Sequence, residues 1–372
     1  MKRMLSALLA LTLLAACLGA LAEPALEIPG LVYESTMPLR YAREFRVDYF
    51  EGGCKLLSIG DSNRYLIVPE GGEVPSGLAA DIRVLRQPLD NIYLAASASM
   101  ALFSALDALD CVKLSALQEN AWYIDAAVEA MRAGEIVYAG KYSAPDYELL
   151  VQSGCDLAIE STMILHTPEV QEMIELLGIP VFIEHSSYED HPLARTEWIK
   201  LYAAMVNKEA EAEAFFDRQA QVIEDLKDFP NTGRTVAFFY ISSDGSVVVR
   251  GGDDYVARMI GIAGGRYVFD EDAGVEADRS SVSITMESFY AAAVDADYLI
   301  YNATIADPLD SLDDLLAKDA LFADFKAVKE GHVWCTGKSL YQATDIVGQL
   351  ITDFNRMLRG DEEGLTFIYK LN

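Results

Sequence analysis

The chain has 372 residues and a hydrophobic content of 52%, which is enough to build one large or two medium domains with extensive cores. Its 58 acidic residues outnumber 29 basic ones and give a formal net charge of −29. This charge argues against a nucleic-acid-binding protein and against adhesion to anionic lipid.

The N-terminus has the layout of a secretory signal peptide. Lys2 and Arg3 precede an apolar run that is too short for a membrane-spanning helix, so residues 1–22 are predicted to direct export. Two cleavage sites compete. The sequence LAAC resembles a lipobox, which would make Cys17 a lipid anchor at the outer face of the cytoplasmic membrane, whereas cleavage after Ala22 would release a periplasmic protein.

Four further cysteines carry no C-x-x-C pair. Export would permit two disulfides, but the wide spacing dictates no connectivity, and buried free thiols fit equally well. The four residues are Cys54, Cys111, Cys155 and Cys335.

The first half of the chain predicts a small antiparallel sheet followed by alternating strands and helices. Short β-rich runs separated by turn residues occupy residues 41–70. After Pro88, apolar strand-like runs alternate with helical segments, a pattern typical of a parallel sheet covered by helices. The predicted strands are NIYLAAS, CVKLSAL, DLAIES and IPVFIE, and the predicted helices are 100–109, 147–152 and 168–177.

A long helical stretch follows, and the alternation then repeats. Residues 196–228 are almost wholly helical in pattern, and the 21 residues 208–228 would form a helix about 31 Å long, enough to span two lobes. Pro230 and Gly233 end it. The second half predicts the strands TVAFFYIS, DYLIYN and VWCTG, and the helices 254–263, 287–293 and 344–358.

These patterns predict an α/β protein with two Rossmann-like lobes, each built on a central, mostly parallel sheet. We expect a single long helix to bridge the lobes. We also expect a ligand cleft between them, because ligands bind beyond the carboxyl ends of parallel strands. The expected divisions are an N-terminal lobe over 38–195, a helical linker over 196–229 and a C-terminal lobe over 230–372.

Several segments resemble a known family. NIYLAASASMALFSALDALD, PDYELLVQSGCDLAIES, LGIPVF, DYVARMIGIAGGRYVF, ITMESFYAAAVDADYLIYN and FKAVKEGHVW occur in the order found in the iron-siderophore and cobalamin class of ABC transporter substrate-binding proteins. The resemblance covers roughly residues 88–358. It implies a monomeric, non-enzymatic periplasmic binding protein without an intrinsic cofactor. Such a protein captures an iron or cobalt chelate and delivers it to a permease dimer.

The resemblance also implies docking and ligand-binding residues. Each lobe in that family presents one surface glutamate to the permease, and the matching positions are Glu148 and Glu287. Hydroxyls and aromatic rings at strand ends suit a bulky chelate, and Arg195 or Arg250 could pair with its anionic oxygens. The ligand-binding candidates are Ser97, Ser99, Ser161, Thr162, His166, Ser187, Tyr188, Tyr240, Ser242, Arg250, Tyr255, Asn302, Thr304 and Tyr341.

Three alternatives stay open. A binding protein for free zinc or manganese would need several histidines or carboxylates around one ion, and His185 and His191 lie near Glu184, Glu189 and Asp190. An exported enzyme is disfavoured, since the chain has no G-x-S-x-G, H-E-x-x-H, P-loop or Rossmann glycine motif. A ligand-sensing subunit on the same fold would use the same cleft. No bound metal ion is expected.

Overall fold

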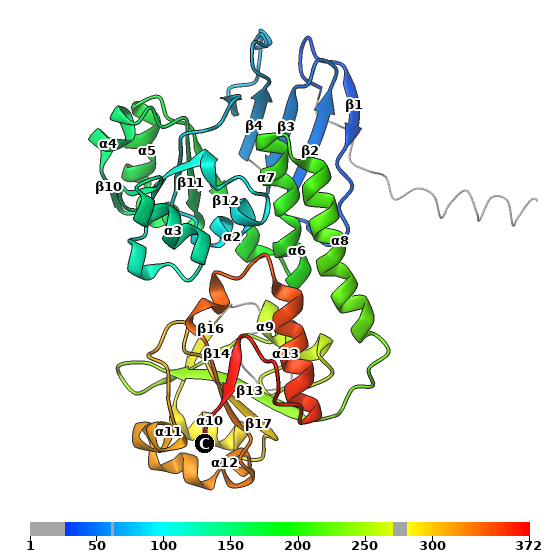
Figure 1. Cartoon of the computed structure of the whole chain (residues 1–372), viewed down its shortest axis with the longest axis vertical. Coiled ribbons are helices and arrows are strands. Elements are labelled where there is room, and N and C mark those ends of the chain that lie inside the picture. Colours follow the sequence, from blue (N-terminus) through cyan, green and yellow to red (C-terminus); the bar gives the residue numbers. More distant parts are fainter. Residues whose placement is uncertain (1–26, 61–62, 271–280) are drawn as a thin grey trace, which may run out of the picture.

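The computed structural model of the chain describes residues 27–60, 63–270 and 281–372 (Figure 1). The predicted signal peptide, including Cys17, lies outside the described residues. Two lobes are stacked along the long axis of the molecule, and helix α8 runs beside both (Figure 1). None of the helices in the described part of the chain is long and apolar enough to cross a membrane.

The chain begins with a five-stranded sheet that packs on the N-terminal lobe. Successive side chains point to opposite faces, so Leu57 and Ile67 join the main core while Leu56 and Leu66 contact a smaller cluster outside it. The first four strands are antiparallel, as predicted, and a fifth pairs parallel to the fourth. They are β1 (Tyr33–Thr36), β2 (Phe45–Phe50), β3 (Lys55–Ile59), β4 (Asn63–Val68) and β5 (Ile82–Arg86).

The N-terminal lobe contains a parallel sheet in the order β12-β11-β6-β7-β8, which confirms the predicted strand arrangement. Its strands are β6 (Ile92–Leu94), β7 (Val112–Ser115), β8 (Val137–Tyr138), β11 (Leu157–Ser161) and β12 (Val181–Glu184). Its helices are α2 (Ser97–Ala105), α3 (Asp125–Ala133), α4 (Tyr147–Gln152) and α5 (Pro168–Leu176), and a hairpin of β9 (Gly140–Lys141) and β10 (Ala144–Pro145) precedes α4.

Three helices follow where one nearly continuous helical stretch was expected: α6 (Pro192–Glu197), α7 (Ile199–Val206) and α8 (Glu209–Leu226). The break falls at Asn207, whose φ of 58° is left-handed, a conformation that asparagine tolerates better than most residues. The buried Lys55 amine supports this turn by donating to Ala204 O and Asn207 Oδ1, both at 2.8 Å. Helix α8 packs against α7 and the C-terminal helix, and its Glu209 pairs with Lys55 of β3, so it contacts both lobes.

The C-terminal lobe is built on a mixed sheet rather than an all-parallel one. Strand β13 (Thr235–Ile241) lies parallel to β15 (Arg266–Tyr267) and β17 (Tyr298–Tyr301), and β17 lies parallel to β18 (Val333–Thr336). Antiparallel strands flank this centre: β14 (Val247–Arg250), β16 (Ser281–Ile284) and β19 (Ile368–Lys370). The helices are α9 (Tyr255–Ile262), α10 (Met286–Ala293), α11 (Leu312–Lys318), α12 (Lys326–Glu330) and α13 (Val347–Arg359).

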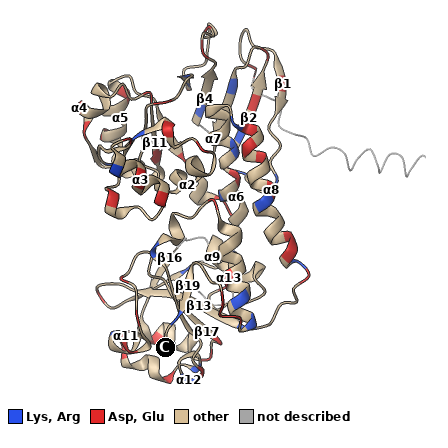
Figure 2. Cartoon of the chain, viewed as in Figure 1, with Lys and Arg blue, Asp and Glu red and all other residues tan. Residues whose placement is uncertain are grey.

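The four cysteines of the described part of the chain are free thiols, and three of them are buried. Acidic residues are spread over both lobes and along α8 (Figure 2). The fold is thus an α/β protein with two lobes, and both lobes hold parallel strands whose carboxyl ends are available to form a site.

Candidate functional site

The two lobes meet through residues that follow β18. The side chain of Gln342 is fully buried, although it belongs to the C-terminal lobe and reaches the loop after β7 in the other lobe. Its Oε1 accepts the Tyr123 N–H at 2.8 Å, and its Nε2 donates to Ala121 O at 2.8 Å. Nearby, the Thr196 hydroxyl of α6 donates to Thr344 O at 2.8 Å. The strand ends of the two lobes are therefore held close together.

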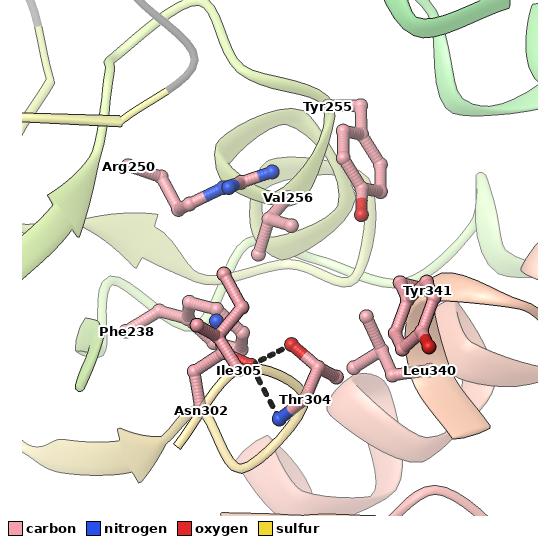
Figure 3. A pocket seen from close by; sticks show the side chains of 9 residues that line it. All are labelled: Phe238, Arg250, Tyr255, Val256, Asn302, Thr304, Ile305, Leu340 and Tyr341. Carbon is pink, nitrogen blue, oxygen red and sulfur yellow. Dashed lines mark hydrogen bonds between the residues drawn. The ribbon is translucent and has the colours of Figure 1, made fainter. Parts of the chain in front are cut away.

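A cavity of about 280 Å³ opens beside this junction, at the carboxyl ends of the C-terminal-lobe strands (Figure 3). It brings together five of the residues singled out from the sequence: Arg250, Tyr255, Asn302, Thr304 and Tyr341. The remaining lining residues are apolar, and their sequence pattern does not distinguish them from core residues. These are Phe238, Val256, Ile305 and Leu340.

Arg250 is held by short-range contacts on both its backbone and its side chain. The Tyr267 hydroxyl accepts the Arg250 N–H and donates to Arg250 O, both at 2.9 Å. Asp254 caps α9 by accepting the Val256 N–H at 2.9 Å, and the same carboxylate oxygen accepts Arg250 Nε at 3.0 Å. The Asp254 carboxylate thus orients the Arg250 side chain, whose guanidinium points toward Tyr255 (Figure 3).

Asn302 and Thr304 form a hydrogen-bonded pair after β17. Asn302 Oδ1 accepts the Thr304 N–H at 3.1 Å and the Thr304 hydroxyl at 2.5 Å (Figure 3). The Asn302 backbone N–H donates to Phe239 O at 2.6 Å, which ties this turn to β13. Both side chains are therefore fixed at the cavity wall by local bonds.

Arg195 of α6 reaches the same place from outside the C-terminal lobe. Its Cζ lies 4.3 Å from the centroid of the Tyr255 ring, and Cζ of Arg250 lies 5.5 Å from that centroid. Arg195, Tyr255, Leu340 and Tyr341 also line a second, much smaller hollow that runs toward α13. Two cations and two tyrosines therefore gather where the helical linker meets the C-terminal lobe.

The other sequence-derived candidates lie elsewhere. Ser99 is buried and its hydroxyl donates to Ala96 O at 2.6 Å, while Ser161 accepts the Met163 N–H at 3.4 Å. Ser242 bonds to Asp244 and Ser246 within a turn. The structure places the rest at other strand ends and brings none of them into the 280 Å³ cavity: Ser97, Thr162, His166, Ser187, Tyr188 and Tyr240.

One buried carboxyl group lies close to this constellation. Burial raises the pKa of Glu184, at the end of β12, while hydrogen bonds from Ser186 and the charge of Arg195 act in the opposite direction. Glu184 Oε1 accepts the Ser186 N–H at 2.7 Å. Its partner is therefore a backbone group of its own loop.

Glu148 and Glu287 occupy equivalent positions in the two lobes. Both side chains are exposed in the first turn of a short helix, and each helix, α4 or α10, precedes a central parallel strand. The Glu287 backbone N–H and the Thr285 hydroxyl lower the pKa of the Glu287 carboxyl. The two glutamates therefore hold equivalent places in the order of elements of their lobes.

The histidines near the linker contact their own loop and the N-terminal segment around residues 41–44. His191 Nδ1 accepts the Leu193 N–H at 3.1 Å at the start of α6, and its ring stacks on Tyr41 with centroids 4.4 Å apart. His185 Nδ1 lies 3.8 Å from a Glu44 carboxylate oxygen. Within residues 27–60, 63–270 and 281–372, no group of three or more His, Cys, Asp or Glu side chains is placed to hold a metal ion.

Comparison with known proteins gives consistent matches. Residues 96–340 match a family described as "Periplasmic binding protein". An uncharacterized lipoprotein of Methanocaldococcus jannaschii is 27% identical over 350 residues, covering 86% of this chain and 80% of the relative.

Solved structures share the fold at low sequence identity. A periplasmic heme-binding protein of Vibrio cholerae has a TM-score of 0.58 at 17% identity, covering 70% of this chain and 97% of its own. A petrobactin-binding protein of Bacillus subtilis has a TM-score of 0.58 at 14% identity, covering 72% of this chain and 92% of its own.

Proposed function

The chain belongs to the periplasmic binding protein family and is a binding protein rather than an enzyme, and from this we propose that it serves as the extracytoplasmic substrate-binding component of an ABC importer. The observation that carries the proposal is the cavity at the carboxyl ends of the C-terminal-lobe strands, where Arg250, Tyr255 and Tyr341 face the junction with the other lobe. This is the place where open α/β sheets bind ligands.

The ligand is a metal chelate: a ferric siderophore, heme or a corrinoid. Structural relatives include a heme-binding and a petrobactin-binding protein, which supports this class. A mostly apolar cavity with aromatic rings and a few polar groups suits a large ligand with polar arms. Arg250, Tyr255, Asn302, Thr304 and Tyr341 form the C-terminal-lobe contacts, and the hydroxyls and rings at the N-terminal-lobe strand ends complete the clamp.

Export and anchoring follow from the same proposal. Cys17 becomes the lipid-bearing residue that holds the protein at the outer face of the cytoplasmic membrane. The curated relative from Methanocaldococcus jannaschii is described as a lipoprotein, which favours this cleavage site over the one after Ala22. Glu148 and Glu287 dock the two lobes against a permease dimer.

Absorbance spectroscopy and native mass spectrometry test the ligand class. The purified protein is mixed in turn with hemin, a panel of ferric siderophores and cyanocobalamin, and then freed of excess ligand. One of these classes should remain bound, adding both colour and mass. Tight binding of aqueous zinc or manganese, lost in the His185→Ala, His191→Ala double variant and accompanied by no chelate binding, would instead favour a free-metal protein.

The lobes should move little when the ligand binds. We propose that they divide at the linker as expected from the sequence, with α8 as a strut between 38–195 and 230–372. Helix α8 is continuous and contacts helices of both lobes, and the Gln342 bonds join the strand ends directly. Small-angle scattering should therefore give nearly equal radii of gyration for the free and loaded protein. A large decrease on loading would contradict the strut.

A further inference from the structure

A single glutamine connects the cavity of the C-terminal lobe to the opposite lobe. Gln342 follows the short turn Lys338–Tyr341, and its side chain is fully buried. Its Oε1 accepts the Tyr123 N–H, and its Nε2 donates to Ala121 O at 2.8 Å and to Tyr341 Oη at 3.0 Å. Of these residues, Tyr341 lines the cavity (Figure 3). The same amide group therefore contacts both the opposite lobe and the cavity wall.

The backbone partners permit only one orientation of this amide. A backbone N–H can only donate and a carbonyl oxygen can only accept, so Oε1 must face Tyr123 and Nε2 must face Ala121. The second N–H of Nε2 then points at the Tyr341 oxygen, which accepts it. That bond uses a lone pair of the phenol and leaves its proton free. The described part of the chain offers this O–H no acceptor, and the side chain is 37% exposed.

The loop that receives Gln342 is firmly built. Trp122, between the two contact residues, is buried, and its Nε1 donates to the Ser115 hydroxyl at 3.1 Å. The same hydroxyl donates to Leu117 O at 2.8 Å, which ties the loop to the end of β7. On the other side, the Gln342 backbone N–H donates to Ser339 O at 2.9 Å. The amide therefore joins two ordered loops, and its bonds fix the spacing between them.

We propose that Gln342 is a positioning residue, which fixes the spacing of the two lobes at the cavity and presents Tyr341 to the ligand as a hydrogen-bond donor. The donor role rests on the proposed function, and it adds that the ligand carries an acceptor atom at this point. Holding both lobes in the binding arrangement before the ligand arrives removes part of the ordering cost of binding. The buried amide cannot rotate without leaving two backbone groups unpaired, so the arrangement is held tightly.

Hydrogen exchange and small-angle scattering test the spacing role without any ligand. In the full mature protein, Gln342→Leu should raise the exchange rate of the Tyr123 amide at least about tenfold, because this N–H loses its acceptor. The radius of gyration of the free protein should increase as the lobes separate. Gln349→Leu is the matched control, since the Gln349 side chain bonds to Asp353 within α13 and to no residue of the other lobe. It should leave both measurements unchanged.

A double-mutant cycle tests the donor role. Hemin, ferrichrome and cyanocobalamin are the probes, and the one that the unaltered protein binds most tightly is titrated. Tyr341→Phe should weaken its binding about three- to tenfold, the effect of one lost hydrogen bond. Gln342→Glu keeps the shape, but its carboxylate cannot donate, so the Tyr341 O–H turns to it and is lost to the probe. In the Gln342→Glu background, Tyr341→Phe should therefore have no further effect.

Thr196→Val separates positioning from a general loss of stability. It removes the hydrogen bond from the Thr196 hydroxyl to Thr344 O, which also joins α6 to the C-terminal lobe, and leaves the Gln342 amide in place. Its melting temperature should fall, yet Tyr341→Phe should still weaken probe binding by the same factor as in the unaltered protein. Thermal melts verify that every variant is folded.

The outcomes separate this inference from the proposed function. An unchanged exchange rate at Tyr123 in Gln342→Leu would overturn the spacing role. Equal losses for Tyr341→Phe in the unaltered protein and in the Gln342→Glu background would overturn the donor role while leaving chelate capture intact. If none of the three probes binds, the proposed function and the donor role fail together, and the exchange experiment still decides the spacing role.

Discussion

Replacing Glu148 and Glu287 together by alanine is expected to abolish transport and the stimulation of ATP hydrolysis in a reconstituted importer, while ligand affinity stays nearly unchanged. Both carboxylates are exposed, and neither lines the cavity. Charged groups at the edge of an interface govern encounter and orientation, and pairs that become desolvated in the complex can contribute several kcal/mol. Losing one contact on each lobe should therefore prevent productive docking.

The geometry of the two helices explains why the pair should act together. Helix α4 precedes β11 and α10 precedes β17, so the two glutamates hold equivalent places in the order of elements of their lobes. Because α8 contacts both lobes, we expect the distance between the carboxylates to stay nearly constant. Two charges at a constant separation can match two basic patches on a dimeric permease, and each single replacement should lose only part of the transport rate.

The matched control is the Glu129→Ala, Asp313→Ala double variant. It also removes one exposed acid from each lobe, from α3 and α11, and leaves the two docking helices intact. It should transport at the normal rate. The docking assignment fails if the Glu148, Glu287 variant transports normally or loses ligand binding, or if the control variant is equally impaired.

The sequence predicts the order of the central elements because long apolar runs and helix stops are local signals. The runs DLAIES and DYLIYN became β11 and β17, and the acid-rich stretch after Lys208 became α8. Strands β14 and β16 were missed, although β14 forms a short hairpin with β13 in which Ile241 pairs with Val247; only the pairing of β16 with β14, which joins Val247 to Ile284, depends on a distant part of the chain. The break between α7 and α8 depends on Lys55, which lies more than a hundred residues earlier.

The candidate site was recovered in part for a related reason. Polar residues after a strand can face a ligand, or they can cap the next helix, and the two roles share one sequence signal. Asn302 and Tyr341 line the cavity, whereas the hydroxyls of Ser99 and Ser161 bond to nearby backbone. The contacts of Gln342 with Ala121 and Tyr123 join residues about two hundred positions apart, so no local sequence pattern predicts them.

A buried carboxyl group under α4 should make stability depend on pH. Glu160 of β11 is fully buried, and both its carboxyl oxygens lack a hydrogen-bond partner within the described residues. Burial raises its pKa from 4.5 to about 8. The group lies near Tyr93 and Tyr147, and its charge would raise the pKa of both phenols. Desolvation alone raises the pKa of Glu160, and no cation among the described residues opposes it.

The sign of the effect follows from which state holds the proton. Between about pH 4.5 and pH 8 the folded protein keeps Glu160 protonated, whereas the unfolded chain has lost that proton. The contribution of Glu160 to the free energy of unfolding is therefore largest below pH 4.5, and it declines as the pH rises toward 8. A shift of this size corresponds to a total fall of about 5 kcal/mol in the free energy of unfolding, which levels off above pH 8.

Urea unfolding measures the contribution of Glu160 to the free energy of unfolding. It is carried out at pH 5, 6, 7 and 8 on the unaltered protein and on Glu160→Gln. Glutamine has nearly the same shape and cannot ionise, so the variant should lose the part of the pH slope that Glu160 supplies and be the more stable protein at pH 8. Other buried acids, such as Asp345 with a pKa raised to about 6 by burial, contribute equally to both proteins and cancel in the difference. Glu169→Gln, on the exposed start of α5, should keep the full slope. Identical slopes for the unaltered protein and Glu160→Gln would show that Glu160 is ionised in the folded state.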